Sequence, residues 1–176
     1  MHGMQAYPTA LSQARPAVRA AAAIAGVGAA TMLGAYFFQY IMGLPPCPLC
    51  LEQRIAYYVS IPLAIIIAIG GAAKAPRLVL AAGLGIIALA MLGNAGLGTY
   101  HAGIEWKWWP GPQECSGTGT DLGSGGDLLS SLSNVTLVRC DEAAWRFLGV
   151  SLAGYNAIIS LGLAAIAAWG ARSEVR

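Results

Sequence analysis

Four long apolar stretches, each free of Asp, Glu, Lys and Arg, alternate with segments that hold the charged residues. The stretches cover residues 20–42, 55–73, 78–97 and 147–169. A bilayer core of about 30 Å is crossed by about 20 apolar residues in a helix, so each stretch is long enough to span a membrane. The pattern therefore predicts an all-α integral membrane protein, built as a four-helix transmembrane bundle.

The composition supports the same class. Of 176 residues, 57% are hydrophobic and only 10% are charged, and the net charge is +2. An ordinary soluble domain is about 25% charged. These values exclude a soluble globular enzyme, a disordered chain and a nucleic-acid-binding protein. Since no internal repeat is visible, we expect residues 1–176 to form a single membrane domain.

The basic residues that flank the spans are distributed unevenly. The two termini and the connection between the second and third spans carry six basic residues and one acid, whereas the other two connections carry four basic residues and seven acids. Loops on the cytoplasmic side hold the excess of Lys and Arg. We therefore expect both termini in the cytoplasm, with the loops at 43–54 and 98–146 on the opposite side.

All four cysteines fall in these two outward loops: Cys47 and Cys50 in the first, Cys115 and Cys140 in the second. An even number of thiols confined to the non-cytoplasmic side is typical of disulfide chemistry in an oxidising compartment. The sequence allows three pairings. We favour Cys47 with Cys50 and Cys115 with Cys140, because a Cys-x-x-Cys pair can close on itself.

The first pair has the chemistry of a reactive site. Pro48 suits the first position of a helix, which would place Cys50 in the first turn. Unpaired backbone N–H groups and the helix dipole stabilise a thiolate there. Arg54 follows one turn later on the same face and adds a permanent positive charge. Glu52 beside Cys50 would disfavour the thiolate unless its side chain points outward.

Two other interpretations of the cysteines remain open. A disulfide that closes so short a loop removes little entropy from the unfolded chain, which argues against a purely structural pair at Cys47 and Cys50. The pair Cys115 and Cys140 could equally pin the long loop or take part in redox chemistry. Four cysteines and His101 could also bind a metal, but structural zinc sites usually show two close ligand pairs, and we expect no metal here.

This chain combines three features: four predicted spans with both termini inside, the motif Cys47-Pro48-Leu49-Cys50 followed by Arg54, and a long outer loop with two further cysteines. In this combination it resembles the DsbB family, the quinone-reducing membrane thiol oxidases of bacteria. The resemblance covers nearly the whole chain. It includes the strings Tyr100-His101 through Trp109-Pro110-Gly111-Pro112 and Cys140-Asp141-Glu142-Ala143-Ala144-Trp145-Arg146-Phe147-Leu148-Gly149.

The resemblance implies an electron relay in the bacterial inner membrane, with the cysteines on the periplasmic side. A thioredoxin-fold partner, a DsbA-like protein, would be reoxidised by the loop pair, with Cys115 forming the mixed disulfide and Cys140 resolving it. The pair Cys47 and Cys50 would reoxidise the loop pair. Electrons would then pass to ubiquinone or menaquinone, as in the DsbA–DsbB–quinone system of the family that the chain resembles.

The resemblance also assigns the residues that meet the quinone. Cys50 would react with it, and Arg54 would hold its carbonyl oxygen as charge develops. A family histidine near the quinone corresponds to His101, which could hydrogen-bond a quinone oxygen or move protons. An interfacial histidine without a role is the alternative.

Two rival functions were weighed against the relay. A vitamin K epoxide reductase-like protein also combines four helices, a Cys-x-x-Cys motif and a quinone, but there the active pair follows the loop cysteines, the reverse of the order here. A non-catalytic membrane scaffold braced by two structural disulfides would have bonds that resist reduction. The amides Gln39, Asn94 and Asn156 within the spans are expected to hydrogen-bond between helices.

Overall fold

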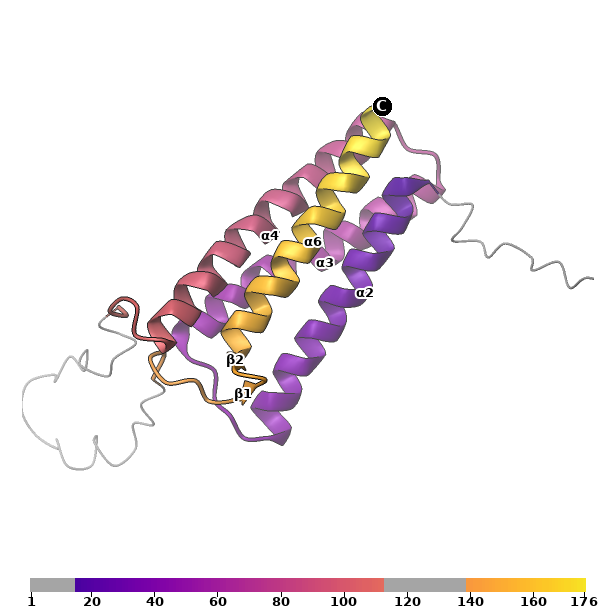
Figure 1. Cartoon of the computed structure of the whole chain (residues 1–176). Helices are drawn as coiled ribbons and strands as arrows, with labels where there is room; N and C mark the ends of the chain where they lie inside the picture. The colour runs from indigo at the N-terminus through magenta and orange to yellow at the C-terminus, as the bar shows by residue number, and fades with distance from the viewer. Residues whose placement is uncertain (1–14, 113–138) are drawn as a thin grey trace, which may run out of the picture.

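A computed structural model describes residues 15–112 and 139–176 of the chain. In this part of the chain, four long helices run side by side as a bundle (Figure 1). Each is long and apolar enough to cross a membrane, which confirms the predicted fold class. The helices are α2 (Pro16–Tyr36), extended by the π-helix η1 (Phe37–Ile41), then α3 (Pro48–Ala72), α4 (Arg77–Glu105) and α6 (Leu152–Val175).

The helices do not end where the charge-free stretches end. α3 begins at Pro48, seven residues before the apolar stretch that starts at 55, and α4 continues past 97 to Glu105. Charged side chains interrupt hydropathy, but they do not break a helix, so the turns that carry Cys50, Arg54 and His101 are helical. Parts of the segments expected as loops thus belong to α3 and α4.

The last helix starts later than the sequence suggests. Residues 146–151 form two short antiparallel strands, β1 (Arg146–Phe147) and β2 (Val150–Ser151). Leu148 and Gly149 make the turn between them with positive φ values of 48° and 81°. The Ser151 Oγ then accepts a hydrogen bond of 3.2 Å from the Gly154 N–H, which caps the first turn of α6. The helix therefore begins at Leu152 and not at the predicted residue 147.

Apolar side chains from all four helices fill the centre of the bundle. Where α4 passes α6, the helices approach so closely that a Cβ on Gly98 would lie 3.0 Å from the Ala157 backbone nitrogen. Such contacts between small residues are a common means of helix packing in membranes. The largest fully buried core side chains include Ile24, Leu84, Ile87, Met91 and Leu163.

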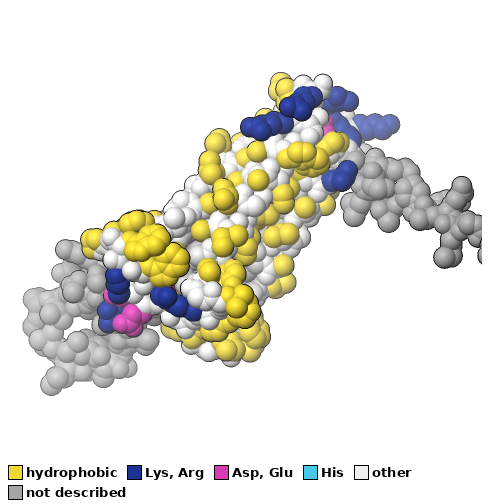
Figure 2. All heavy atoms as spheres, in the orientation of Figure 1, with side chains coloured by type: hydrophobic (Ala, Val, Ile, Leu, Met, Phe, Trp, Pro, Cys, Tyr) yellow, Lys and Arg dark blue, Asp and Glu magenta, His cyan; other side chains and the backbone are white. Residues whose placement is uncertain are grey.

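The two ends of the bundle differ. α2 starts and α6 finishes at the same end, where the Arg15 guanidinium pairs with the buried Glu174 carboxylate. Lys and Arg gather at that end, and apolar side chains are spread along the face of the bundle in view (Figure 2). Cys47, Cys50 and Cys140 lie at the opposite end, which therefore holds the candidate site.

Candidate functional site

Two free thiols occupy the start of α3. Cys47 is the N-cap residue, Pro48 takes the first helical position and Cys50 lies in the first turn, as the sequence predicts. The two Sγ atoms are 2.8 Å apart, and the Cys47 Sγ also accepts a hydrogen bond from the Cys50 N–H at 3.3 Å. The hydrogen bond with Cys50 and burial raise the pKa of the Cys47 thiol. Glu52 is exposed on the outside of the bundle.

His101 reaches the same pair from α4. Its Nε2 lies 3.7 Å from the Cys47 Sγ, and its ring is 2% exposed. The Gln53 amide donates through Nε2 to the His101 Nδ1 at 2.9 Å. A neutral imidazole that accepts at Nδ1 carries its proton on Nε2. The N–H of His101 is therefore directed at Cys47.

Arg54 lies one turn beyond Cys50, on the side of α3 that faces α2. Its Nη1 donates to the Gln39 Oε1 at 2.7 Å, and its guanidinium carbon lies 5.3 Å from the centre of the Tyr36 ring. No carboxylate pairs with Arg54 among the described residues. Its positive charge is therefore held in place by neutral groups and remains available to an anionic partner.

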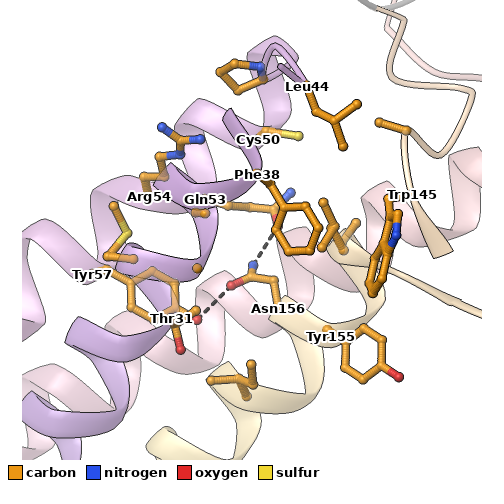
Figure 3. Close-up of a pocket in the computed structure, with 18 of the residues that line it drawn as sticks. Thr31, Phe38, Leu44, Cys50, Gln53, Arg54, Tyr57, Trp145, Tyr155 and Asn156 are labelled. Atoms are coloured by element: carbon orange, nitrogen blue, oxygen red, sulfur yellow. Dashed lines mark hydrogen bonds between the residues drawn. The ribbon is translucent and has the colours of Figure 1, made fainter. Parts of the chain in front are cut away.

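A cavity of about 440 Å³ opens between α2, α3, α6 and the segment 144–147. We call it the α2–α3–α6 cavity. Its walls are mostly apolar, with Phe38, Leu44 and Trp145 among them (Figure 3). Sulfur, amide, guanidinium and phenol groups also face it, from Cys50, Gln53, Arg54, Tyr57 and Asn156. His101 does not line this cavity, and it is connected to it through Gln53 and, by way of Cys47, through Cys50.

Hydrogen bonds continue from Gln53 into the bundle. The Gln53 Oε1 accepts from the Asn156 Nδ2 at 2.6 Å, and the Tyr57 hydroxyl donates to the Asn156 Oδ1 at 2.7 Å. Asn94 donates to the Ser160 Oγ at 2.9 Å. The expectation that Asn94 and Asn156 bond between helices is confirmed, and Gln39 bonds to Arg54. The sequence analysis missed Gln53, Tyr57 and Ser160, although the spacing of four between 53 and 57, and between 156 and 160, places each pair on one helix face.

The second cysteine pair is described in part. Cys140 is disulfide-bonded and fully buried, and it packs in one small cluster with Cys47, Leu49 and Ile104. Its predicted partner Cys115 lies outside the described residues. The cluster brings a cysteine of the long loop beside the pair at the start of α3.

The segment that follows Cys140 is fixed by ion pairs. Asp141 accepts from the Arg139 Nη2 and from the Lys107 Nζ, both at 2.8 Å. These hydrogen bonds, first from Arg139 and then from Lys107, hold the pKa of the Asp141 carboxyl well below its usual range. Lys107, two residues after the end of α4, therefore ties the segment to that helix.

Glu105, at the last position of α4, is a buried acid that the sequence analysis did not single out. Its Oε1 lies 3.9 Å from the His101 Nε2, and its Oε2 has no hydrogen-bond partner among the described residues. It stands one helical turn after His101, and this spacing was the only sequence signal for it. Cys47, Cys50, His101 and Glu105 thus form one group, while Arg54 faces the cavity.

Comparison with known proteins gives a consistent result. The family model described as disulfide bond formation protein DsbB matches residues 17–170. A disulfide bond formation protein B of Methylococcus capsulatus is 32% identical over 78% of this chain and 83% of its own length. One from Stutzerimonas stutzeri is 30% identical over 83% of this chain and 90% of its own. No solved structure matches the chain.

Proposed function

The chain belongs to the DsbB family of membrane disulfide bond formation proteins, and from that premise we propose that it is a thiol:quinone oxidoreductase. In this proposal it reoxidises a periplasmic DsbA-like dithiol protein and transfers the electrons to ubiquinone or menaquinone in the membrane. The alternative of a non-catalytic scaffold gains no support from Cys47 and Cys50, which are both free thiols.

The position of Cys50 is the observation that carries the proposal. Its sulfur contacts Cys47 on one side and lines the α2–α3–α6 cavity on the other. One cysteine of the pair is therefore accessible from an apolar cavity that lies among membrane-spanning helices. A pair that served only to brace the loop would need no such access.

The cavity fits a quinone headgroup. Its volume falls within the range of roughly 300 to 1,000 Å³ that is usual for small-molecule sites, and its walls suit an apolar ring. Arg54, Gln53 and Asn156 supply donors for carbonyl oxygens at its polar side. When bound, a quinone is an acceptor of two electrons and two protons.

The residues of the chain have separate tasks in this reaction. Oxidation of Cys47 and Cys50 forms one S–S bond and releases two electrons and two protons to the acceptor. Arg54 provides a fixed positive charge beside Cys50, where negative charge develops on an oxygen. The His101 N–H directed at Cys47 stabilises negative charge on that sulfur when its proton leaves.

Exchange between the two cysteine pairs completes the relay. A thiolate of the reduced loop pair attacks the Cys47–Cys50 disulfide through a mixed disulfide, so one pair is oxidised as the other is reduced. Cys140 and Cys47 share one buried cluster, which makes them the sulfurs closest to this step. Cys115 would be the cysteine that meets the soluble partner.

The proposal also includes the orientation of the bundle in the membrane. Lys and Arg gather at the end of the bundle opposite the cysteines (Figure 2). Because cytoplasmic ends hold such an excess, the cysteine end would face the periplasm. A soluble periplasmic partner could then reach the loop pair, and the inner-membrane quinone pool could reach the cavity from the side.

The experiment that tests the proposal measures quinone reduction by the purified protein in detergent. A reduced thioredoxin-fold dithiol protein serves as donor, and the native chain is compared with Cys50→Ser and Cys115→Ser. We expect loss of quinone absorbance that requires the donor and both cysteines. If the native protein leaves the quinone unchanged while its disulfides survive mild reductant, the proposal is wrong and a bracing role replaces it.

A further inference from the structure

The thiols of Cys47 and Cys50 and the imidazole of His101 form a compact donor cluster, which we call the Cys2His cluster. The three ligand atoms all lie within 4.8 Å of one another. We propose that the reduced Cys2His cluster binds a thiophilic divalent cation such as Zn²⁺ or Cd²⁺, which holds the cysteine pair in its dithiol form.

The donor set suits such a cation. Zinc binds thiolate sulfur at about 2.3 Å and imidazole nitrogen at about 2.0 to 2.1 Å in tetrahedral geometry. At the tetrahedral angle, these lengths separate two sulfurs by about 3.8 Å and a sulfur from a nitrogen by about 3.6 Å. The distance of 3.7 Å between Cys47 and His101 already fits, while the sulfurs, at 2.8 Å, must move apart. Cys50 is only partly buried and lines a cavity, so its side chain has room to turn.

Charge balance favours the site although it is buried. Cys47 and His101 are 3% and 2% exposed, so an isolated cation there would lose most of its hydration. Two thiolates neutralise a divalent cation, and a neutral imidazole adds a third ligand without adding charge. From the sequence, a metal was not expected because Cys115 and Cys140 are too far apart to form a second close ligand pair. The fold supplies another ligand instead, since α4 brings His101 beside the first pair.

A fourth ligand position has a nearby protein donor. The Glu105 Oε1 lies 3.9 Å from the His101 Nε2, and the Glu105 Oε2 has no hydrogen-bond partner among the described residues. Water could occupy the same position. The carboxylate makes the pocket around the cluster more favourable for a cation than for a neutral molecule.

Gln53 would respond to the metal. The cation takes the lone pair of the His101 Nε2, so the ring proton moves to Nδ1 and the Gln53 amide must present its oxygen there. Ligating histidines usually donate their other N–H to an oxygen, and a carboxylate raises the basicity of the ring. The variant Gln53→Glu should therefore bind the cation more tightly, whereas Gln53→Leu should bind it more weakly.

The binding step is balanced without electron transfer. Two S–H bonds break, two sulfur–metal bonds form and two protons leave, so a chelator reverses the step. Oxidation of the pair to a disulfide removes both thiolates, and the site therefore exists only in the reduced protein. It depends on the dithiol and the ring alone, and it would stand even if the α2–α3–α6 cavity took no quinone.

Cadmium titration of the full chain in detergent tests the proposal. A Cys115→Ser/Cys140→Ser variant leaves Cys47 and Cys50 as the only cysteines. After reduction and anaerobic desalting, thiolate-to-cadmium absorption and the bound metal content are measured. We expect one Cd²⁺ per reduced chain and none per oxidised chain. His101→Ala should weaken binding at least ten-fold, and His2→Ala, which removes the only other histidine, should have no effect.

The comparison of the reduced and oxidised forms of the same protein needs no variant of the ligands, so a folding defect cannot obscure it. Equal binding by the two forms would overturn the proposal. The proposal would also be overturned if reduced His101→Ala bound the cation as tightly as the parent protein does, because the thiolates would then hold the cation without the ring.

Discussion

The Cys47 Sγ lies 3.7 Å from the His101 Nε2, although the two residues stand 54 positions apart and belong to different helical segments. The Gln53 amide fixes the other side of the ring at 2.9 Å. The imidazole is thus directed at Cys47, while Arg54 is one of the residues that line the cavity beside Cys50. The imidazole and the guanidinium therefore lie on different sides of the cysteine pair.

His101→Phe is expected to slow oxidation of the cysteine pair, because Phe retains bulk but removes the N–H that faces Cys47. Proton transfer by a positioned side chain contributes about 100-fold or more to rates, so a loss of about 100-fold is expected in turnover. The measurement is the rate of disulfide formation between Cys47 and Cys50 after mixing with a quinone. His2→Ala is the matched control, and an unchanged rate in His101→Phe would show that the ring has no such role.

Arg54→Met should lower kcat/KM for the quinone by about 100-fold, as expected when a charged donor beside developing negative charge is removed. Arg54→Lys keeps the charge but loses the planar fork, so it should fall between Met and the native residue. Steady-state assays over a range of quinone concentrations measure the effect. Arg19→Met, an exposed arginine at the other end of the bundle, serves as control. Equal losses in the two Met variants would contradict a local role for Arg54.

Asp141→Asn should make the Cys140 disulfide react faster with a soluble reductant. The change weakens the ion pairs with Arg139 and Lys107 that hold the segment after Cys140. Thiol release is measured by alkylation and mass spectrometry. Glu142→Gln is the matched control, because Glu142 is exposed and pairs with Arg139 at 3.3 Å but with no other residue in the described part of the chain. A disulfide equally reactive in both variants would contradict this anchoring role.

The Asp141 carboxylate should also make the reactivity of the Cys140 disulfide depend on pH. Its pKa in the folded protein is held well below the usual range by Arg139 and Lys107. The stabilisation that the ion pairs of Asp141 provide is therefore fully present above the pKa of the unfolded chain, about 3.9. It is lost as the pH falls below that value toward the pKa of the folded protein. Corrected for the thiolate fraction of the reductant, the reactivity of the disulfide should thus stay constant near neutral pH and increase only in acid. An increase between pH 8 and pH 6 would be inconsistent with this assignment.

Two neighbouring glycines of α4 should respond oppositely to alanine. A Cβ at Gly98 would meet the Ala157 backbone at 3.0 Å, whereas none of the described atoms lies within 4 Å of a Cβ at Gly96. Gly98→Ala is expected to destabilise the protein by about 1 to 3 kcal/mol through overpacking. Gly96→Ala should stabilise it by up to about 1 kcal/mol through helix propensity. Thermal unfolding in detergent compares them, and equal midpoints would refute the close approach of α4 and α6.

Several features were predictable from local pattern. Apolar length alone predicts the four helices, and Pro48 marks the start of α3 because it needs no donor there. The interhelical bonds of Asn94 and Asn156 follow from the cost of an unpaired amide inside a membrane. These predictions depend only on residues close in sequence or on the bilayer, so no knowledge of the packing was needed.

The partners across helices were not predictable. Which face of α4 meets α3 is set by helix rotation, and hydropathy is nearly uniform around each helix. The contacts of His101 with Cys47 and of Gln53 with Asn156 therefore could not be predicted from hydropathy. Glu105 was missed for a related reason, because the apolar stretch ends at 97 while the helix continues to Glu105. The roles assigned to the site residues remain predictions for the experiments above.

A single turnover tests the central claim most directly, namely that the cysteine pair at the start of α3 gives its electrons to a quinone. The reduced Cys115→Ser/Cys140→Ser protein is mixed with one equivalent of a short-chain ubiquinone, without any thiol donor. We predict that one quinone is reduced per chain as both remaining thiols disappear, and that Cys50→Ser in the same background reduces none. A quinone that stays oxidised while both thiols persist would contradict the account.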